Sequence, residues 1–574
     1  MSAAPDTEPA SRSVLERLGI AEDPLVGVDP VSFLRSLATV GTSLVRNPTG
    51  TAAANARMMI GTLSALRATA GRTVGLKSEG PVSPATGDKR FLDQAYAENP
   101  FYFLLQQQYL LSAQLVTELL DVAGLEASTD VKARFAAKFV LDALAPTNTL
   151  PGNPAAIRQA FDTGGKSLVR GALNMLGDIR HNGGWPSQVD ATGFEVGENM
   201  AATAGEVVYR SDLIELIQYT PQTTKVHAVP MLFCPPWINK YYIMDLAPGK
   251  SLIEWAVQHG HTCFAISYRN PDASMSDLDF EDYLFQGPLD AQRVVREITG
   301  AEQVNTVSVC LGGTLTAIGL AHQAAVGDTS VKSATFLNTH TDFSTPGALG
   351  VFTDEATIAG LERQMKKRGY LDSDKMAHTF DALRANDLVF GYLVNNWLLG
   401  KKPPAFDLLV WNKDSTRMPA KMHSTYLRSC YLRNDFATGD FVVDGSPVDP
   451  GKVEVASYVL SAVDDHIVPW VSGYKTTQLL GGASRFVLST SGHIAGIVNP
   501  PSPKAKHWVS EDPLPVDPQE WKASAALVDG TWWEDWATWA AGQGGPQVNA
   551  PRRLGSKDHP PIEAAPGSYV RTRA

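Results

Sequence analysis

Beyond about residue 200, short apolar runs alternate with helix-like segments, and this alternation restricts the fold more than any other feature of the chain. The runs are rich in β-branched and aromatic residues, as in VPMLFCPPW, TCFAISY, VNTVSVC, SATFLNT, VEVASYVLSAVDD and SRFVLSTS. Such runs are typical of buried strands. Because strands that alternate with helices usually pair in parallel, the pattern predicts a mostly parallel, doubly wound sheet.

The preceding part of the chain has a helical pattern instead. Up to about Glu195, apolar residues recur at three- and four-residue spacing, as in FYFLLQQQYLLSAQLVTELLDVAG and VKARFAAKFVLDALA. We therefore predict an all-α domain over residues 1–195, with the first 25 or so residues disordered, and an α/β catalytic domain over residues 196–574. A chain of 574 residues, 44% of them hydrophobic, is long enough for two such cores.

The alternation of strands and helices lapses between about Thr341 and Asp440. This stretch is helical in pattern and rich in tryptophan and tyrosine, as in LRANDLVFGYLVNNWLLG. Its length and position are typical of a cap inserted over an active site. A surface insertion without a catalytic role is the alternative.

Charge and cysteine usage argue against several classes of protein. Lys and Arg number 49 against 60 Asp and Glu, so the net charge of −11 gives no broad basic surface for nucleic acid. The four cysteines are widely spaced, without a CxxC pair, so neither a zinc site nor a disulfide framework is indicated. No apolar stretch approaches the roughly 20 residues of a membrane helix, and the N-terminus does not resemble a signal peptide. We therefore expect a cytoplasmic protein without a transmembrane segment.

One cysteine occupies a turn with a specific pattern. In NTVSVCLGGTLT, a predicted strand ends at Cys310 and a predicted helix follows at once. This is the context of the nucleophile elbow of α/β-hydrolase folds, which needs small residues two positions before and after the nucleophile. Ser308 and Gly312 hold these positions, so the chain departs from the usual GxSxG pattern twice. The alternative is that Cys310 is a small buried apolar residue at a strand end.

A nucleophilic thiol needs a base and an acid that orients this base, and in α/β-hydrolase folds both follow the nucleophile in the order acid, histidine. Asp465 lies after the strand VEVASYVLSA, within VDDHIVPW, and Asp464 is the competing candidate. His493 comes after the next strand, in STSGHIAG. The sequence thus predicts a triad of Cys310, Asp465 and His493.

The oxyanion of an acyl-transfer intermediate needs two backbone amides. One is expected from Leu311, directly after the nucleophile, and the second from Ile238 in FCPPWINKYY, which follows an early strand. A proline-stiffened turn without a catalytic role is the alternative for this loop. No motif indicates a metal site or a bound cofactor.

Longer segments carry a more specific resemblance. They are RFLDQAYAENPFYFLLQQQYL, LPGNPAAIRQAFDTGGKSLVRGALNML, PPWINKYYIMDLAPGKSLIEWAVQHGHTCFAISYRNPD, LVWNKDSTRMPAKMHSTYLR, VDDHIVPW, SGHIAGIVNPP, GTWWEDWATW and APGSYVRTRA. Together they resemble the polyhydroxyalkanoate synthases across most of the chain. The family's box reads GxCxG, so the resemblance places Cys310 on its nucleophile, Asp465 on its acid and His493 on its base. Ser308 is the departure, and His466, which follows the acid, is expected to shape the pocket.

The resemblance implies a function. Enzymes of this family polymerise (R)-3-hydroxyacyl-CoA with release of CoA, and a thiol nucleophile suits this reaction because one thioester is exchanged for another. It also implies a homodimer that acts in the cytoplasm at the surface of polyester granules, with a leaning towards short monomers and no cofactor besides the CoA thioester. The phosphates of CoA need basic neighbours such as Lys240 or Lys250, but isolated lysines usually solvate a surface, so both stay without an assigned role. The alternatives are a cysteine-dependent thioesterase and a non-catalytic granule scaffold.

Overall fold

The computed structural model describes residues 30–573, which form two compact units. The first unit contains residues 30–190 and also His378–Ala405, and the second contains Ala191–Ala377 and the chain from Phe406 onward. The disorder expected for the first 25 or so residues lies outside the described part of the chain. No helix within residues 30–573 combines the length and the apolar character needed to cross a bilayer.

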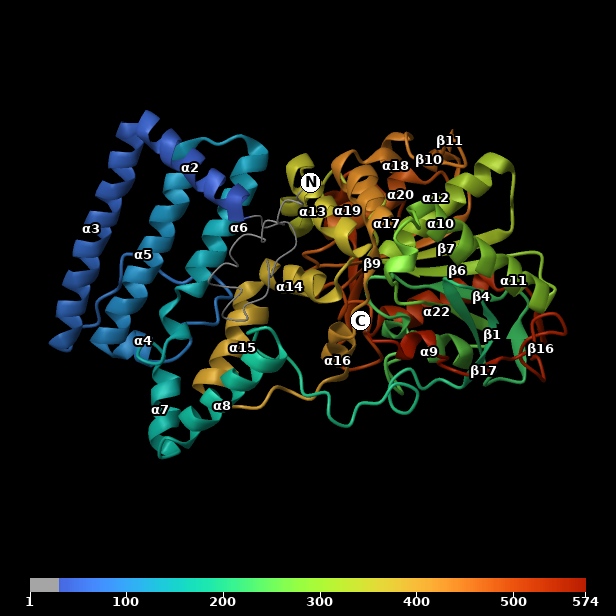
Figure 1. Ribbon diagram of the computed structural model, residues 1–574, viewed down its shortest axis with the longest axis horizontal. Helices are drawn as coiled ribbons and strands as arrows, with labels where there is room; N and C mark the ends of the chain where they lie inside the picture. The colour runs from blue at the N-terminus through green and yellow to red at the C-terminus, as the bar shows by residue number, and fades with distance from the viewer. Residues whose placement is uncertain (1–29, 574) are drawn as a thin grey trace, which may run out of the picture. The chain divides into compact units, whose positions relative to one another are not determined.

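The first unit is built of helices. Three of its helices begin with an Asn-Pro pair, in which the Asn side chain accepts a hydrogen bond from an amide of the first turn and the proline fills the first helical position. Helix α3 packs along α5, and both are blue in Figure 1. The main helices are α2 (Pro30–Arg46), α3 (Pro48–Thr73), α5 (Pro100–Ala123), α6 (Ala127–Ala143), α7 (Pro154–Asp162) and α8 (Lys166–His181).

The second unit is organised around an eleven-stranded sheet with the order β15-β14-β13-β12-β7-β6-β4-β5-β2-β1-β17. The strands are β1 (Gly205–Arg210), β2 (Ile214–Tyr219), β4 (Met231–Cys234), β5 (Cys263–Tyr268), β6 (Val304–Val309), β7 (Val331–Leu337), β12 (Ala456–Ala462), β13 (Ser484–Ser489), β14 (Lys506–Val509), β15 (Ala526–Asp529) and β17 (Glu563–Ala564). The strands from β13 to β5 in this order are parallel. The strands at both edges pair antiparallel and extend the parallel core that the sequence predicted. The sheet is therefore mixed.

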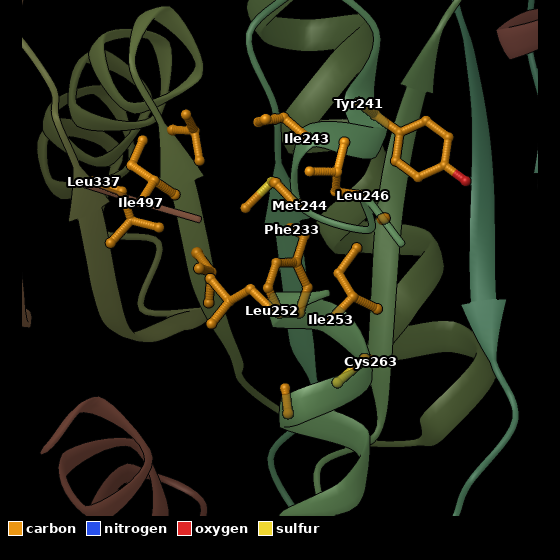
Figure 2. Packing of buried hydrophobic residues seen from close by; sticks show 14 of the residues in the cluster. Phe233, Tyr241, Ile243, Met244, Leu246, Leu252, Ile253, Cys263, Leu337 and Ile497 are labelled. Atoms are coloured by element: carbon orange, nitrogen blue, oxygen red, sulfur yellow. The ribbon is translucent and has the colours of Figure 1, made fainter. Parts of the chain in front are cut away.

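The parallel strands are buried on both faces, which explains why they read as continuous apolar runs. Figure 2 shows one side of this core, where Phe233 of β4 and Leu337 of β7 pack with Ile253 and Ile497. Helices α9 (Leu252–Gln258), α11 (Asp290–Thr299), α12 (Leu311–Val326) and α22 (Trp532–Gln543) cover the sheet. The core holds the carboxyl ends of the parallel strands in fixed positions.

The region of the expected insertion, residues 341–440, is divided between the two units. Residues 378–405 group with the N-terminal helices, and the remainder groups with the sheet. Helices α13 (Glu355–Arg368), α16 (Asp407–Lys413), α17 (Ala420–Thr425) and the π-helical turn η8 (Tyr426–Leu432) belong to the second part. The expected division at residue 195 lies close to the change of unit after Asp190. That this region caps an active site stays a prediction.

Candidate active site

The expected catalytic side chains all follow strands of the parallel core. Cys310 comes after β6, Asp465 after β12 and His493 after β13. These strands lie near one another in the sheet, and their carboxyl ends share one edge. In open α/β sheets this edge is where ligands bind, so the topology alone brings the three residues to one place.

Cys310 has the strained backbone of a nucleophile elbow. Its φ of 49° and ψ of −120° fall where residues with a side chain are rarely found. The strain is maintained by the neighbouring strand, because the amide of Cys310 donates to the carbonyl oxygen of Leu337 at 2.9 Å. The carbonyl of Cys310 in turn accepts from the amide of Gly313 at 2.9 Å. The side chain is thereby held at the tip of a tight strand-to-helix turn.

Small residues surround this turn for a steric reason. A Cβ at Gly312 would lie 2.5 Å from the carbonyl oxygen of Pro235, which is backbone and cannot give way. Ser308, which departs from the glycine of the family's box, is fully buried, and its hydroxyl donates to Thr316 Oγ1 at 2.9 Å. Thr316 Oγ1 passes the hydrogen bond on to the carbonyl oxygen of Gly312 at 2.8 Å. The extra hydroxyl therefore has a partner, and the elbow accommodates serine.

Asp465, and not Asp464, bonds the histidine. Asp465 Oδ2 lies 2.6 Å from His493 Nδ1, and both side chains are buried. The other carboxylate oxygen, Oδ1, accepts hydrogen bonds from the amides of Ile467 and Val468 at 2.8 and 2.9 Å. Asp464 is exposed. The carboxylate of Asp465 is thus fixed on one side by backbone, with its free oxygen directed at the imidazole.

His493 also interacts with the thiol of Cys310. Burial by itself lowers the pKa of His493, but the Asp465 carboxylate and the neighbouring Cys310 outweigh it, so the pKa of His493 lies well above its ordinary value. The structure therefore brings Cys310, His493 and Asp465 together in one chain of contacts, in the order that an acyl-transfer triad requires.

Two tryptophans of α22 support the segment that carries His493. Trp532 and Trp533 are almost completely buried, and their indole nitrogens donate to the carbonyl oxygens of Gly496 and Ile497 at 2.8 and 3.0 Å. The side chain of Asn338, which follows β7, donates to the carbonyl oxygen of His493 itself. The tryptophans are core residues whose polar atoms anchor the histidine loop.

The two expected oxyanion amides lie on adjoining segments. Leu311 is the first residue of α12, so its amide has no intrahelical partner. Ile238 belongs to the loop after β4, a strand that pairs with β6 so that Cys234 faces Ser308. A hydrogen bond holds this loop in place, because the carbonyl oxygen of Ile238 accepts from the amide of Thr416 at 3.0 Å. That the amide of Ile238 faces an oxyanion stays a proposal.

The sequence did not single out three residues that lie close to the triad. Tyr426 and Tyr431 of η8 are buried, contact each other edge to face with ring centroids 5.3 Å apart, and interact electrostatically with Cys310. Burial raises the pKa of both tyrosines, so they are neutral phenols at neutral pH. His340 follows β7 and donates from Nε2 to the carbonyl oxygen of Ile467 at 3.1 Å. Only His340 carried a usable signal, because it stands at the carboxyl end of the predicted strand SATFLNT.

The contacts of the remaining candidate residues restrict the roles that these residues can have. His466 is half-buried between the acid and Ile467, and its proposed part in shaping the pocket stays a prediction. Lys240 Nζ donates to the carbonyl oxygens of Val570 and Thr572 and pairs with Asp414 at 2.9 Å. Lys250 pairs with Asp407 at 2.6 Å. Both lysines are therefore already engaged within the chain. Within residues 30–573, no group of three or more His, Cys, Asp or Glu side chains is arranged to hold a metal ion.

Comparison with known proteins identifies the fold and the family. Residues 87–256 match the family model for the N-terminus of poly-beta-hydroxybutyrate polymerase (PhaC), and residues 229–500 match the alpha/beta hydrolase fold. The fold predicted from the elbow is thus confirmed.

Three curated relatives match over most of their length. The chain is 43% identical over 500 residues to the poly(3-hydroxyalkanoate) polymerase subunit PhaC of Cupriavidus necator, covering 85% of this chain and 84% of that protein. It is 41% identical to the poly(3-hydroxyalkanoate) polymerase of Methylorubrum extorquens, covering 94% and 90%, respectively. It is 39% identical to poly(3-hydroxyalkanoate) polymerase 2 of Ectopseudomonas oleovorans, covering 96% and 97%. The predicted resemblance is confirmed, and the chain belongs to the poly(3-hydroxyalkanoate) polymerase family.

Proposed function

We propose that this chain polymerises hydroxyacyl-CoA into polyhydroxyalkanoate through a covalent acyl-thioester on Cys310. The observation that carries the proposal is the contact chain from Cys310 through His493 to Asp465 at the carboxyl edge of the sheet. Family membership supplies the class of substrate and product. A thiol is the suitable nucleophile, because the acyl group passes from one thioester to another and keeps its reactivity.

In the first half-reaction, His493 takes the proton of the Cys310 thiol and the thiolate attacks the thioester carbonyl carbon. The new C–S bond forms as the carbonyl electrons move to oxygen, where the amides of Leu311 and Ile238 would stabilise the charge. Collapse of this intermediate breaks the bond to CoA. The CoA sulfur leaves with the proton that His493 returns, so protons and electrons balance.

In the second half-reaction, the 3-hydroxyl of another acyl unit attacks the acyl-Cys310 carbonyl. His493 takes the hydroxyl proton, an ester bond forms, and the Cys310 thiolate leaves and recovers the proton. Asp465 suits an orienting role, because one of its oxygens is occupied by two amides and the other faces His493 Nδ1. It would hold the imidazole with Nε2 directed at the reacting groups and stabilise the imidazolium.

Polymerisation competes with hydrolysis of the acyl-enzyme, so water must be kept from Cys310. The buried phenols of Tyr426 and Tyr431 lie beside the nucleophile and support a covering role for η8. We further propose, from the resemblance to the family, that the substrates are short, (R)-configured 3-hydroxyacyl units. We also propose that the enzyme is a homodimer that acts at the surface of cytoplasmic polyester granules.

The decisive experiment supplies the purified protein with (R)-3-hydroxybutyryl-CoA and follows free thiol release together with insoluble polyester. Wild type is expected to yield both, and Cys310→Ala to yield neither. Cys263→Ala serves as the matched control, because Cys263 is buried at the amino end of β5, away from the catalytic edge. Thiol release with only soluble hydroxy acid would identify a thioesterase. No thiol release from short or longer acyl chains would leave the scaffold alternative.

A further inference from the structure

A hollow lined by several cationic side chains lies on the sheet-containing unit. It has a volume of about 510 Å³ and is lined by the loop after β5, the last turn of α13 and the first turn of α17. Helices α13 and α17 pack side by side there (Figure 1). We call it the basic pocket, after its four cationic lining residues Lys366, Lys367, Arg368 and Lys421.

The charges around the basic pocket do not cancel. Its lining holds two carboxylates, and that of Glu362 is already paired with Arg428, which lies outside the lining, at 2.7 Å. Arg368 is paired with Asp372. Among residues 30–573, neither Lys366 nor Lys367 has a carboxylate within ion-pair distance. Counting the second carboxylate, Asp277, the lining has four cations against two carboxylates, so the pocket is net positive in a chain whose net charge is −11.

Helix stabilisation explains only part of this charge. Lys366 and Lys367 stand in the last turn of α13, where cations interact favourably with the helix dipole. Lys421 stands in the first turn of α17, where a cation is unfavourable. Its Nζ forms an ion pair with Asp279, which lies outside the lining, at 3.4 Å. The helix dipole therefore does not explain why Lys421 stands at this hollow.

The basic pocket is built from segments that adjoin the elements around Cys310. One wall of the pocket is the loop that follows β5. This loop begins at the carboxyl edge of the sheet, where Cys310 follows β6. From Lys421, helix α17 leads directly into η8, whose Tyr426 interacts with Cys310. Five residues of helix correspond to a rise of about 7.5 Å. An elongated thioester with its acyl end at Cys310 can therefore place its far end near Lys421.

We propose that the basic pocket binds the phosphorylated adenosine end of coenzyme A, through Lys366, Lys367 and Lys421. This inference rests on the proposed function, because it concerns the substrate of the same site. The diphosphate and the 3′-phosphate of CoA carry the negative charge that three ammonium groups recognise. The pantetheine arm then runs along α17 towards the nucleophile. Lys240 and Lys250, already engaged within the chain, are not needed.

The test compares two thioesters, of which one lacks the phosphorylated adenosine end of CoA. (R)-3-hydroxybutyryl-CoA and the same acyl group on pantetheine are assayed for thiol release with wild type, with Lys366→Gln plus Lys367→Gln, and with Lys421→Gln. The KM for the CoA thioester is expected to rise about tenfold in the double variant, as for lost charged contacts. The KM for the pantetheine thioester is expected to stay constant. The matched control is Lys332→Gln plus Lys452→Gln, at the amino end of β7 and in the short turn before β12, and it should leave both KM values unchanged.

Each outcome decides between explanations. An equal rise of KM for both thioesters, or no rise for either, overturns the phosphate site. A fall in melting temperature without a change in KM would show that Lys366 and Lys367 serve only helix α13, and would equally overturn it. If wild type releases thiol from neither thioester, the proposed function fails, and this result is distinct from a failure of the pocket.

Discussion

His340 donates a hydrogen bond from Nε2 to the backbone carbonyl oxygen of Ile467, at 3.1 Å. A carbonyl oxygen only accepts, so the proton of this imidazole is assigned to Nε2. The amide of the same residue, Ile467, donates to Asp465 Oδ1 at 2.8 Å. Burial lowers the pKa of His340 to about 4, so the ring is neutral at neutral pH. His340 thus holds the loop that fixes Asp465, without placing a positive charge beside the triad.

This contact makes His340 a positioning residue. Replacement His340→Leu removes one hydrogen bond to the acid-bearing loop, a loss of about 1 kcal/mol, and we expect kcat to fall roughly three- to tenfold with little change in KM. His340→Gln keeps a donor and should recover part of the rate. Steady-state thiol release from (R)-3-hydroxybutyryl-CoA measures both variants. Equal kcat values for wild type and His340→Leu would remove His340 from the support of Asp465.

The elbow makes opposite predictions for its two small positions. Gly312→Ala places a Cβ 2.5 Å from the carbonyl oxygen of Pro235, so the loop after β4 must move. We expect a loss of about 1 to 3 kcal/mol of stability and almost all activity. Ser308→Gly removes only the hydrogen bond to Thr316 and restores the residue of the family's box, so activity should persist. Thermal unfolding and thiol release distinguish the two variants. An active Gly312→Ala enzyme would contradict the tight packing of the elbow.

The C-terminal segment ties down the expected oxyanion loop. The buried ammonium of Lys240, two residues after Ile238, donates to the carbonyl oxygens of Val570 and Thr572 at 2.6 and 2.8 Å. Truncation after Tyr569 removes both acceptors, each worth about 1.5 to 3 kcal/mol to a charged donor. We expect a lower melting temperature and a kcat reduced about tenfold, in line with a displaced loop.

The control for the truncation follows from the identity of the acceptors. Both are backbone oxygens, so Thr572→Ala keeps them and should leave the melting temperature and kcat at their wild-type values. A truncated enzyme with full activity would show that the segment after Tyr569 does not hold the loop.

Local patterns were sufficient for the parallel core and for the elbow. The run VNTVSVC corresponds to β6 and Cys310. A buried strand that is followed at once by a helix leaves little conformational freedom for the residue between them. The edge strand β15 was not predicted, because all four of its residues are exposed and its place depends only on pairing with β14. Asp464 remained a competing candidate beside the predicted Asp465 for a similar reason. Neighbouring residues point to opposite sides, and only the folded loop shows which side faces His493.

Contacts between segments that are distant in the chain could not be predicted from the sequence. Tyr426 and Tyr431 come to Cys310 across more than a hundred residues, through the folding of the region that interrupts the strand pattern. The division of that region between two units also depends on tertiary packing. Gly171 of α8, for example, allows the close approach of the backbone of Trp397, which a Cβ would overlap. No periodicity in either segment indicates this partner.

The buried His261 predicts how stability responds to acid. Its ring stacks on His227 with centroids 4.5 Å apart, and within the described chain neither ring nitrogen has a hydrogen-bond partner. Burial, together with His227 and His259, lowers the pKa of His261 to about 3. An unfolded histidine titrates near 6.5, so the unfolded state takes up this proton first as the pH falls. The free energy of unfolding therefore falls from about pH 6.5 towards pH 3, by up to about 2 kcal/mol at pH 5 through this residue.

His261→Phe keeps the ring stacking and removes the titration. Compared with wild type, the variant should lose less stability between pH 8 and pH 5, by up to about 2 kcal/mol. The comparison at pH 8, where the histidine is neutral in both folded and unfolded states, separates this effect from any packing difference. Urea unfolding followed by tryptophan fluorescence at both pH values measures it. The same loss of stability in variant and wild type would mean that His261 is protonated in the folded protein, and the assigned burial of a neutral ring would be wrong.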